Sequence, residues 1–98
     1  MTQVEPLAEN VILEGLSQFT GWEYADQKVS KTFTFEGYLE CVNFVNVVAS
    51  IAERQAHHPD VILHYGKVTI SYSTHDAGHQ VSAKDLKAIE AVEAYQAL

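Results

Sequence analysis

The segment from residue 36 to residue 56 constrains the fold most, because its apolar residues recur at helical spacing throughout. They form two stripes, one with Leu39, Val42, Val45, Ala49 and Ala52, and one with Cys41, Phe44, Val48 and Ile51. A helix that covers a sheet needs only one apolar stripe. The second stripe therefore predicts a further apolar contact, with other helices or with a second copy of the chain.

Both ends of this helix adjoin segments whose apolar and polar residues alternate, as in β-strands. We expect two hairpins, with strands at 22–26 and 29–35 and at 61–65 and 67–74. The hairpin turns are predicted at Asp26-Gln27-Lys28 and around Gly66. Pro59 disfavours helical geometry at the residue before it, so the helix should end near His57.

Two further helices are predicted. The first spans residues 4–17 with Pro6 in its opening turn, and the last runs from the Ser82–Asp85 capping box to about Tyr95. The resulting order is helix, two strands, helix, two strands, helix. The chain has 98 residues, of which 47% are hydrophobic. That is enough for a single domain over residues 1–98 with a core of its own.

The composition excludes several functions. The net charge is −7 with only six Lys and Arg, which argues against direct binding of DNA or RNA. No stretch approaches the roughly 18 consecutive apolar residues of a membrane span, and no secretory signal is evident, so we expect a cytoplasmic protein without a membrane segment. Cys41 is the single cysteine, which fits a reducing compartment, and its apolar neighbours predict that it is buried.

Three histidines carry the strongest indication of chemistry. His57 and His58 precede Pro59 at the predicted end of the helix, and His75 follows the last predicted strand. A histidine titrates near neutral pH, so two of them facing one small molecule can supply an acid and a base. Glu53 lies four residues before His57, which predicts that its carboxylate orients that imidazole. We expect His58 to point elsewhere and to line another wall of the same pocket.

Each of these residues also has a plainer interpretation. A solvated histidine pair at a helix end is common, and His64 and His79 are expected to be ordinary surface residues. Asp85 needs no role beyond the capping box. Trp22 and Tyr65 are expected in the core or in a pocket wall. A metal site competes with acid–base chemistry, but adjacent histidines seldom reach one ion, and the spacing matches no helical histidine pair, so no metal is expected.

The spacing of these residues resembles a family signature. It consists of Glu53, His57-His58-Pro59, Tyr65, His75 and Asp85, and it resembles the signature of the pterin-4a-carbinolamine dehydratases. The similarity runs from Leu16 onward and includes Gly21-Trp22, Lys31-Thr32-Phe33 with Phe35, Phe44-Val45-Asn46, Val48-Ala49 and Ser73-Thr74-His75. The loop from Gly78 to Ser82 departs from it, because it is one residue longer than the usual form.

The resemblance implies a fold and an activity. The fold is α+β, a four-stranded antiparallel sheet with three helices on one face, in chains that associate as homodimers or homotetramers. The activity is dehydration of 4a-hydroxytetrahydrobiopterin, or of a related 4a-hydroxytetrahydropterin, to the quinonoid dihydropterin. This step recycles the cofactor of aromatic amino-acid hydroxylases, which are possible partners, and needs no metal or organic cofactor. Some vertebrate relatives also act as a dimerisation cofactor and coactivator of a homeodomain transcription factor, so an interaction module is the alternative.

The resemblance also assigns roles to residues. His57 and His75 are the acid and base candidates, His58 binds and polarises the pterin, and Glu53 tunes the cluster. Which histidine donates a proton and which accepts one stays open, as does the identity of the pterin. Contacts to the pterin are expected from residues that flank or include these histidines, namely Ala56, His57, His58, Pro59, Ser73, Thr74, His75 and Asp76.

Overall fold

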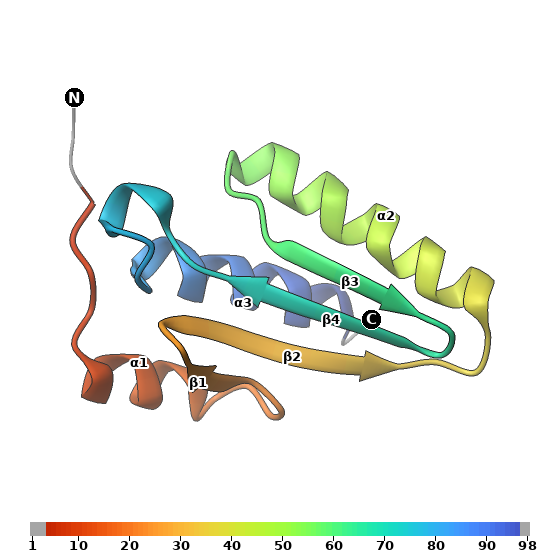
Figure 1. Ribbon diagram of the computed structural model, residues 1–98, viewed down its shortest axis with the longest axis horizontal. Helices are drawn as coiled ribbons and strands as arrows, with labels where there is room; N and C mark the ends of the chain where they lie inside the picture. The colour runs from red at the N-terminus through yellow and green to blue at the C-terminus, as the bar shows by residue number, and fades with distance from the viewer. Residues whose placement is uncertain (1–3, 97–98) are drawn as a thin grey trace.

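The computed structural model describes residues 4–96, and its elements follow the predicted order. Figure 1 shows them in sequence: α1 (Glu9–Leu16), β1 (Glu23–Ala25), β2 (Lys28–Thr34), α2 (Tyr38–Gln55), β3 (Asp60–His64), β4 (Lys67–Tyr72), a short 3-10 helix η1 (His75–Ala77), and α3 (Ala83–Gln96). The α-β-β-α-β-β-α order and the α+β class are confirmed. The 3-10 helix was not predicted.

The sheet has the strand order β1-β2-β4-β3, and every neighbouring pair is antiparallel. The three α-helices cover one face of it (Figure 1). On that face β4 buries Val68, Ile70 and Tyr72 completely. The other face is polar, and its strands are joined by side-chain hydrogen bonds, such as the 2.9 Å contact between the hydroxyls of Thr32 and Thr69. The predicted alternation of β4 is therefore confirmed.

The core lies between the sheet and the helices. Phe33 of β2 packs against Phe44 of α2 with ring centroids 4.7 Å apart, and against Trp22 at 6.0 Å. Cys41 is fully buried, as predicted, and Trp22 is only 6% exposed. Burying side chains of this size contributes roughly 1.5–3 kcal/mol each. This core holds α2 and α3 against the sheet, so the ends of these helices have fixed positions.

The start of α1 differs from the prediction. The helix begins at Glu9, and Pro6 precedes it instead of lying in its first turn. The backbone N–H of Leu7 donates to the carbonyl of Val81 at 2.8 Å, and Ala8 is extended with ψ 152°. This tertiary hydrogen bond and the extended N-cap keep the residues before Glu9 out of the helix.

The end of α2 matters most for function. Ala56 follows the helix in the left-handed conformation with φ 52°. The N–H of His57 donates to the carbonyl of Ala52 at 3.1 Å, and the N–H of Ala56 donates to that of Glu53 at 3.3 Å. These two bonds form a Schellman motif, which is usually closed by Gly because a side chain disfavours positive φ. The chain therefore turns sharply just before the histidine pair.

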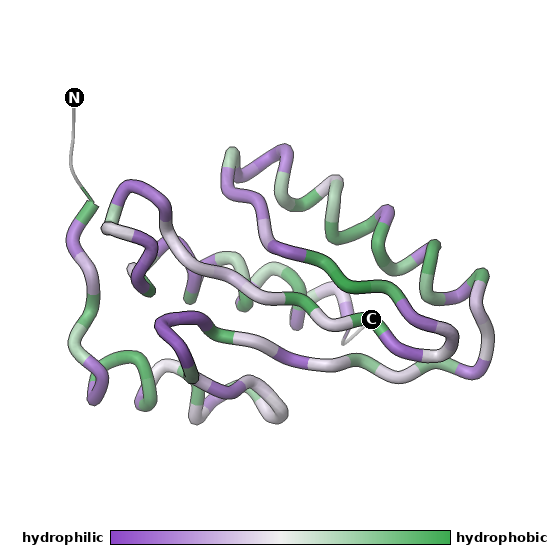
Figure 2. The backbone as a smooth tube through the Cα atoms, in the orientation of Figure 1, coloured by the Kyte–Doolittle hydropathy of each residue, from purple (hydrophilic) through white to green (hydrophobic). Residues whose placement is uncertain are grey.

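Apolar side chains also remain on the surface of α2 and β3. Figure 2 shows hydrophobic stretches along both elements, which are neighbours in the structure. Leu39 is 70% exposed and Ile62 is 53% exposed. Tyr65, predicted to be core or pocket wall, lies in the β3–β4 turn and is 73% exposed, so that prediction was wrong. Among the described helices, none is long and apolar enough to cross a membrane.

Candidate active site

A pocket of about 280 Å³ lies where α2 and β4 end and where η1 and α3 begin. Its walls hold most of the predicted site residues together with one lysine, namely Ala56, His57, His58, Ser73, Thr74, His75, Asp76 and Lys84. All three candidate histidines therefore border one pocket, although they come from two segments that are far apart in the sequence. Pro59 instead lines a neighbouring hollow between α2 and β3, which Glu53 also borders.

The carboxylate that contacts His57 is not the predicted one. The Nε2 atom of His57 lies 2.5 Å from Oδ1 of Asp85, whereas Glu53 contacts Nε2 of His58 at 2.5 Å. The expectation that Glu53 orients His57 was wrong because it assumed that helical spacing continues to residue 57. The helix ends at Gln55 and Ala56 reverses the backbone, so His57 leaves the face on which Glu53 lies.

The two histidine–carboxylate contacts differ in burial. The side chain of Asp85 is fully buried and that of His57 is 10% exposed, while His58 and Glu53 are 60% and 77% exposed. Water screens an exposed pair, and such pairs contribute about 0–1 kcal/mol. A buried carboxylate with all its partners in place fixes geometry much more strongly. The His57–Asp85 pair is therefore the rigid part of the cluster.

Asp85 is held by further hydrogen bonds around its second oxygen. Oδ2 accepts from the hydroxyl of Thr74 at 2.7 Å and from the backbone N–H of Ser82 at 2.9 Å. The Ser82 hydroxyl lies 2.6 Å from that of Thr74 and accepts from the N–H of Lys84 at 3.1 Å. The predicted capping box is confirmed. Asp85 has the additional contact with His57, which the sequence argument did not assign.

Tyr72 forms the floor under His57. The two rings stack with centroids 5.7 Å apart and planes 13° apart. Burial, and then the charge of Asp85, raise the pKa of Tyr72 to about 12, so its hydroxyl stays neutral at physiological pH. Within residues 4–96 this buried hydroxyl has no hydrogen-bond partner. Tyr72 therefore contributes a flat apolar surface, and it is not an acid or base at neutral pH.

His75 differs from the other two histidines. It opens η1 and is exposed. Its ring lies edge-on to that of His79, with centroids 4.4 Å apart and planes 85° apart. His79 is exposed, as predicted for a surface residue, yet it contacts a candidate catalytic side chain. His64 is also exposed and lies in β3, outside the pocket wall.

Lys84 and Asp85 are the site residues that sequence reasoning missed. Lys84 lines the pocket from the first turn of α3, where a positive charge is disfavoured by the helix dipole. That unfavourable position was visible in the sequence and could have indicated a role. For Asp85, the capping-box assignment was correct but incomplete, because the contact with His57 depends on how two distant segments pack.

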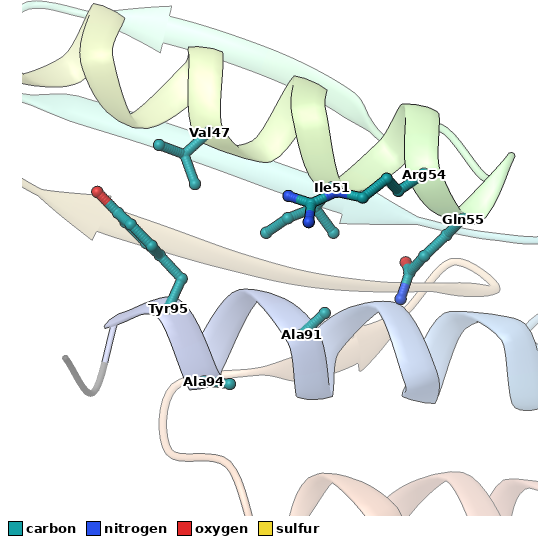
Figure 3. A pocket seen from close by; sticks show the side chains of 7 residues that line it. All are labelled: Val47, Ile51, Arg54, Gln55, Ala91, Ala94 and Tyr95. Atoms are coloured by element: carbon teal, nitrogen blue, oxygen red, sulfur yellow. The ribbon is translucent and has the colours of Figure 1, made fainter.

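A larger hollow of about 530 Å³ lies between α2 and α3 (Figure 3). Its walls are mostly apolar, and its polar side chains are Arg54, Gln55 and Tyr95. Among the described residues that line it, none carries an imidazole or a carboxylate, so these residues offer no acid–base pair near neutral pH. This hollow is larger than the pocket at the end of α2, but the three histidines line the smaller pocket, so we take the smaller pocket as the candidate active site. In the described part of the chain no three histidine, cysteine or acidic side chains are grouped to hold a metal ion.

The fold and this pocket define a small α+β protein whose clustered histidines can bind and protonate a polar small molecule. Residues 5–95 match the family model described as pterin 4 alpha carbinolamine dehydratase. A relative from Sulfolobus acidocaldarius, provisionally named a pterin-4-alpha-carbinolamine dehydratase, is 37% identical over 92% of this chain and 98% of its own. The chain belongs to the pterin-4a-carbinolamine dehydratase family.

Two further comparisons agree with this assignment. A relative from Chromobacterium violaceum with the same provisional name is 42% identical over 73 residues, which is 74% of this chain and 68% of the relative. The crystal structure of a transcriptional coactivator/pterin dehydratase from Brucella melitensis superposes with a TM-score of 0.84 at 26% identity, covering 92% of this chain and 97% of that one. The fold expected from the resemblance is thus confirmed.

Proposed function

We propose that this chain catalyses the dehydration of 4a-hydroxytetrahydrobiopterin, or of a closely related 4a-hydroxytetrahydropterin, to the quinonoid dihydropterin and water. One observation carries the proposal: three imidazoles border a single pocket, and one of them is held by a fully buried carboxylate. The family assignment gives the substrate class, and the pocket offers groups suited to acid–base chemistry.

The reaction needs one proton donor and one proton acceptor. The hydroxyl on C4a leaves as water once its oxygen is protonated, and loss of the N5 proton neutralises the resulting cation. His57 and His75 are the two groups that we assign to these steps, and His58 binds and polarises the ring. The assignment of donor and acceptor between His57 and His75 stays open.

Asp85 limits how His57 can act. Oδ2 of Asp85 accepts from Thr74 and Ser82, and Oδ1 lies 2.5 Å from Nε2 of His57. Because an ionised carboxylate only accepts hydrogen bonds, we assign the hydrogen in this contact to Nε2 of His57. Its Nδ1 is then the nitrogen that is free to exchange a proton with the substrate. Tyr72 beneath the ring restricts its tilt. Together these two contacts hold the imidazole in one tautomer and one orientation.

The cellular role follows from the proposed reaction. Removal of the carbinolamine is one step in recycling the cofactor of aromatic amino-acid hydroxylases, since the quinonoid dihydropterin must still be reduced, and such a hydroxylase is the partner that we propose. We place the protein in the cytoplasm as a homodimer or homotetramer. Leu39 on α2 and Ile62 on β3 are exposed apolar side chains, and they are surface that we expect a second copy to cover.

The proposal is tested by the rate of loss of 4a-hydroxytetrahydropterin generated in situ and followed by absorbance. The chelator-treated protein should accelerate dehydration, and a His57→Ala/His75→Ala double variant should not. If chelation abolishes the acceleration, a metal is required and the proposed mechanism is wrong. If the folded protein gives no acceleration before or after chelation, the dehydratase assignment is wrong.

A second candidate is a protein-interaction module. The Brucella melitensis protein is named a transcriptional coactivator as well as a pterin dehydratase, and the exposed apolar residues on α2 and β3 offer surface for a partner protein. This function would leave the pocket histidines and the buried Asp85 without a purpose. An interaction module predicts that the His57→Ala/His75→Ala double variant binds its partner protein as tightly as the unaltered protein does. Affinity capture with a homeodomain transcription factor would measure this binding.

A further inference from the structure

His79 lies in the loop that follows η1, where the backbone is held in an unusual conformation. Gly78 and His79 are both left-handed, with φ 70° and 62°. The N–H of His79 donates to the carbonyl of Thr74 at 3.1 Å, and the N–H of Thr74 donates to that of Gln80 at 2.9 Å. These bonds close the loop, so His79 has a fixed place relative to His75.

The backbone of His79 lies in the left-handed region, which histidine adopts more often than most side chains but at a higher steric cost than glycine. A side chain disfavours positive φ, and Gly or Asn adopt it most readily. The loop would therefore fold at least as well with either of those residues. A backbone position that carries a steric cost beside a functional group suggests a role for the side chain held there. The imidazole of His79 contacts the ring of His75, with centroids 4.4 Å apart and planes 85° apart.

His75 needs such a neighbour more than the other pocket histidines do. Within residues 4–96, hydrogen bonds to carboxylates hold the rings of His57 and His58, whereas no side-chain hydrogen bond holds the ring of His75. An exposed side chain without a partner changes rotamer on a picosecond to nanosecond timescale. Edge-to-face contact with a second ring is favourable and restricts that motion.

We propose that His79 is a positioning residue that holds the imidazole of His75 in the orientation needed at the pocket. The proposal rests on the function assigned above to His75. His79 lies in the loop from Gly78 to Ser82, which joins η1 to α3. His79 itself does not line the pocket and needs no contact with the substrate.

Two substitutions distinguish the effect of the His79 ring from the effect of its backbone conformation. His79→Asn removes the ring but suits the left-handed conformation, and His79→Phe keeps a ring at the same place. We expect His79→Asn to lower kcat on the order of 10-fold with KM changed less than about 2-fold, because misorientation of a catalytic group affects the chemical step. His79→Phe should restore kcat to within about 2-fold of the original. Equal kcat in all three proteins, or an equal loss in both variants, would overturn the proposal.

Two further measurements distinguish failure of this inference from failure of the dehydratase assignment. In a His75→Ala background, His79→Asn should cause no additional loss, and an additive loss would contradict coupling between the rings. Side-chain NMR needs no activity: the ring protons of His75 should carry a ring-current shift that disappears in His79→Asn. If that shift is absent from the unaltered protein, His79 does not hold His75, whatever the catalytic result.

Discussion

Among single residues, Asp85 connects the start of α3 to the ring of His57. One carboxylate oxygen completes the capping box and the other contacts the imidazole. Because both contacts are buried, a change at this residue affects the helix start and the tautomer of His57 together. The capping role was predictable from local spacing. The contact with His57 was not, since it depends on the packing of α3 against the end of α2.

Asp85→Asn should lower kcat/KM roughly 10- to 1,000-fold, because the amide cannot stabilise a charged imidazole and can reverse the preferred tautomer. Glu90→Gln makes the same change at an exposed position of the same helix and should leave the rate unaltered. Steady-state dehydration rates, measured below the unfolding temperature of each variant, check this. Equal rates for both variants would exclude a role for Asp85.

Tyr72→Phe should leave the free energy of unfolding unchanged or raise it by about 1 kcal/mol at pH 7, because it removes a buried hydroxyl without a partner. Burial raises the pKa of Tyr72 from its ordinary value of 10.0 to about 12, so the folded state resists its ionisation. The tyrosine therefore destabilises the protein as the pH rises from about 10 to 12, by about 2–3 kcal/mol in total. Denaturant unfolding at pH values across this range should show that the free energy of unfolding of Tyr72→Phe exceeds that of the unaltered protein by more as the pH rises. A difference in free energy that stays constant with pH would contradict this prediction.

At the scale of elements, the end of α2 decides which side chains meet. Pro59 correctly placed the helix end to within a few residues, but the pairing of Glu53 with His57 depended on the turn itself. The left-handed Ala56 was not predictable, because alanine carries no local preference for positive φ. Periodicity fixed the strands of both hairpins closely. It failed at α1, where a tertiary hydrogen bond from Leu7 determines the start.

Ala56→Gly should stabilise the protein by about 1 kcal/mol, because glycine adopts positive φ without the steric cost. For a domain of this size the midpoint of thermal unfolding should rise by about 4–8 °C. Ala49→Gly provides the matched control in the exposed middle of α2, where the same change should destabilise by about 1 kcal/mol. A lower midpoint of thermal unfolding for Ala56→Gly would show that the steric cost of positive φ at residue 56 does not reduce the stability of the protein.

For the whole molecule, the sheet-and-helix architecture brings residues from α2, β4, η1 and α3 to one edge of the fold. The sequence supplied the fold class and the histidines, since both depend on local patterns and on a family signature. It did not supply Lys84 in the pocket wall or the ring contact between His75 and His79, because these arise from the folded arrangement. The spare apolar stripe of α2 remains a prediction about association.

Leu39→Glu should reduce the molar mass of the protein in solution, because it places a charge in the apolar surface that we expect a second copy to cover. Leu39 is 70% exposed, and Leu13 on α1 is 49% exposed, so Leu13→Glu is a matched control that should keep the original mass. Size-exclusion chromatography with light scattering measures the molar mass of all three proteins. A monomeric unaltered protein would contradict the expected homodimer or homotetramer.

The dehydration rate of single histidine variants tests the central claim most directly. His57→Ala and His75→Ala should each lower turnover by a factor on the order of 10 to 10,000, the range for loss of a general acid or base. His64→Ala removes an exposed histidine outside the pocket wall and should keep full turnover. If His57→Ala and His75→Ala are folded and as active as His64→Ala, the pocket histidines do not perform the reaction.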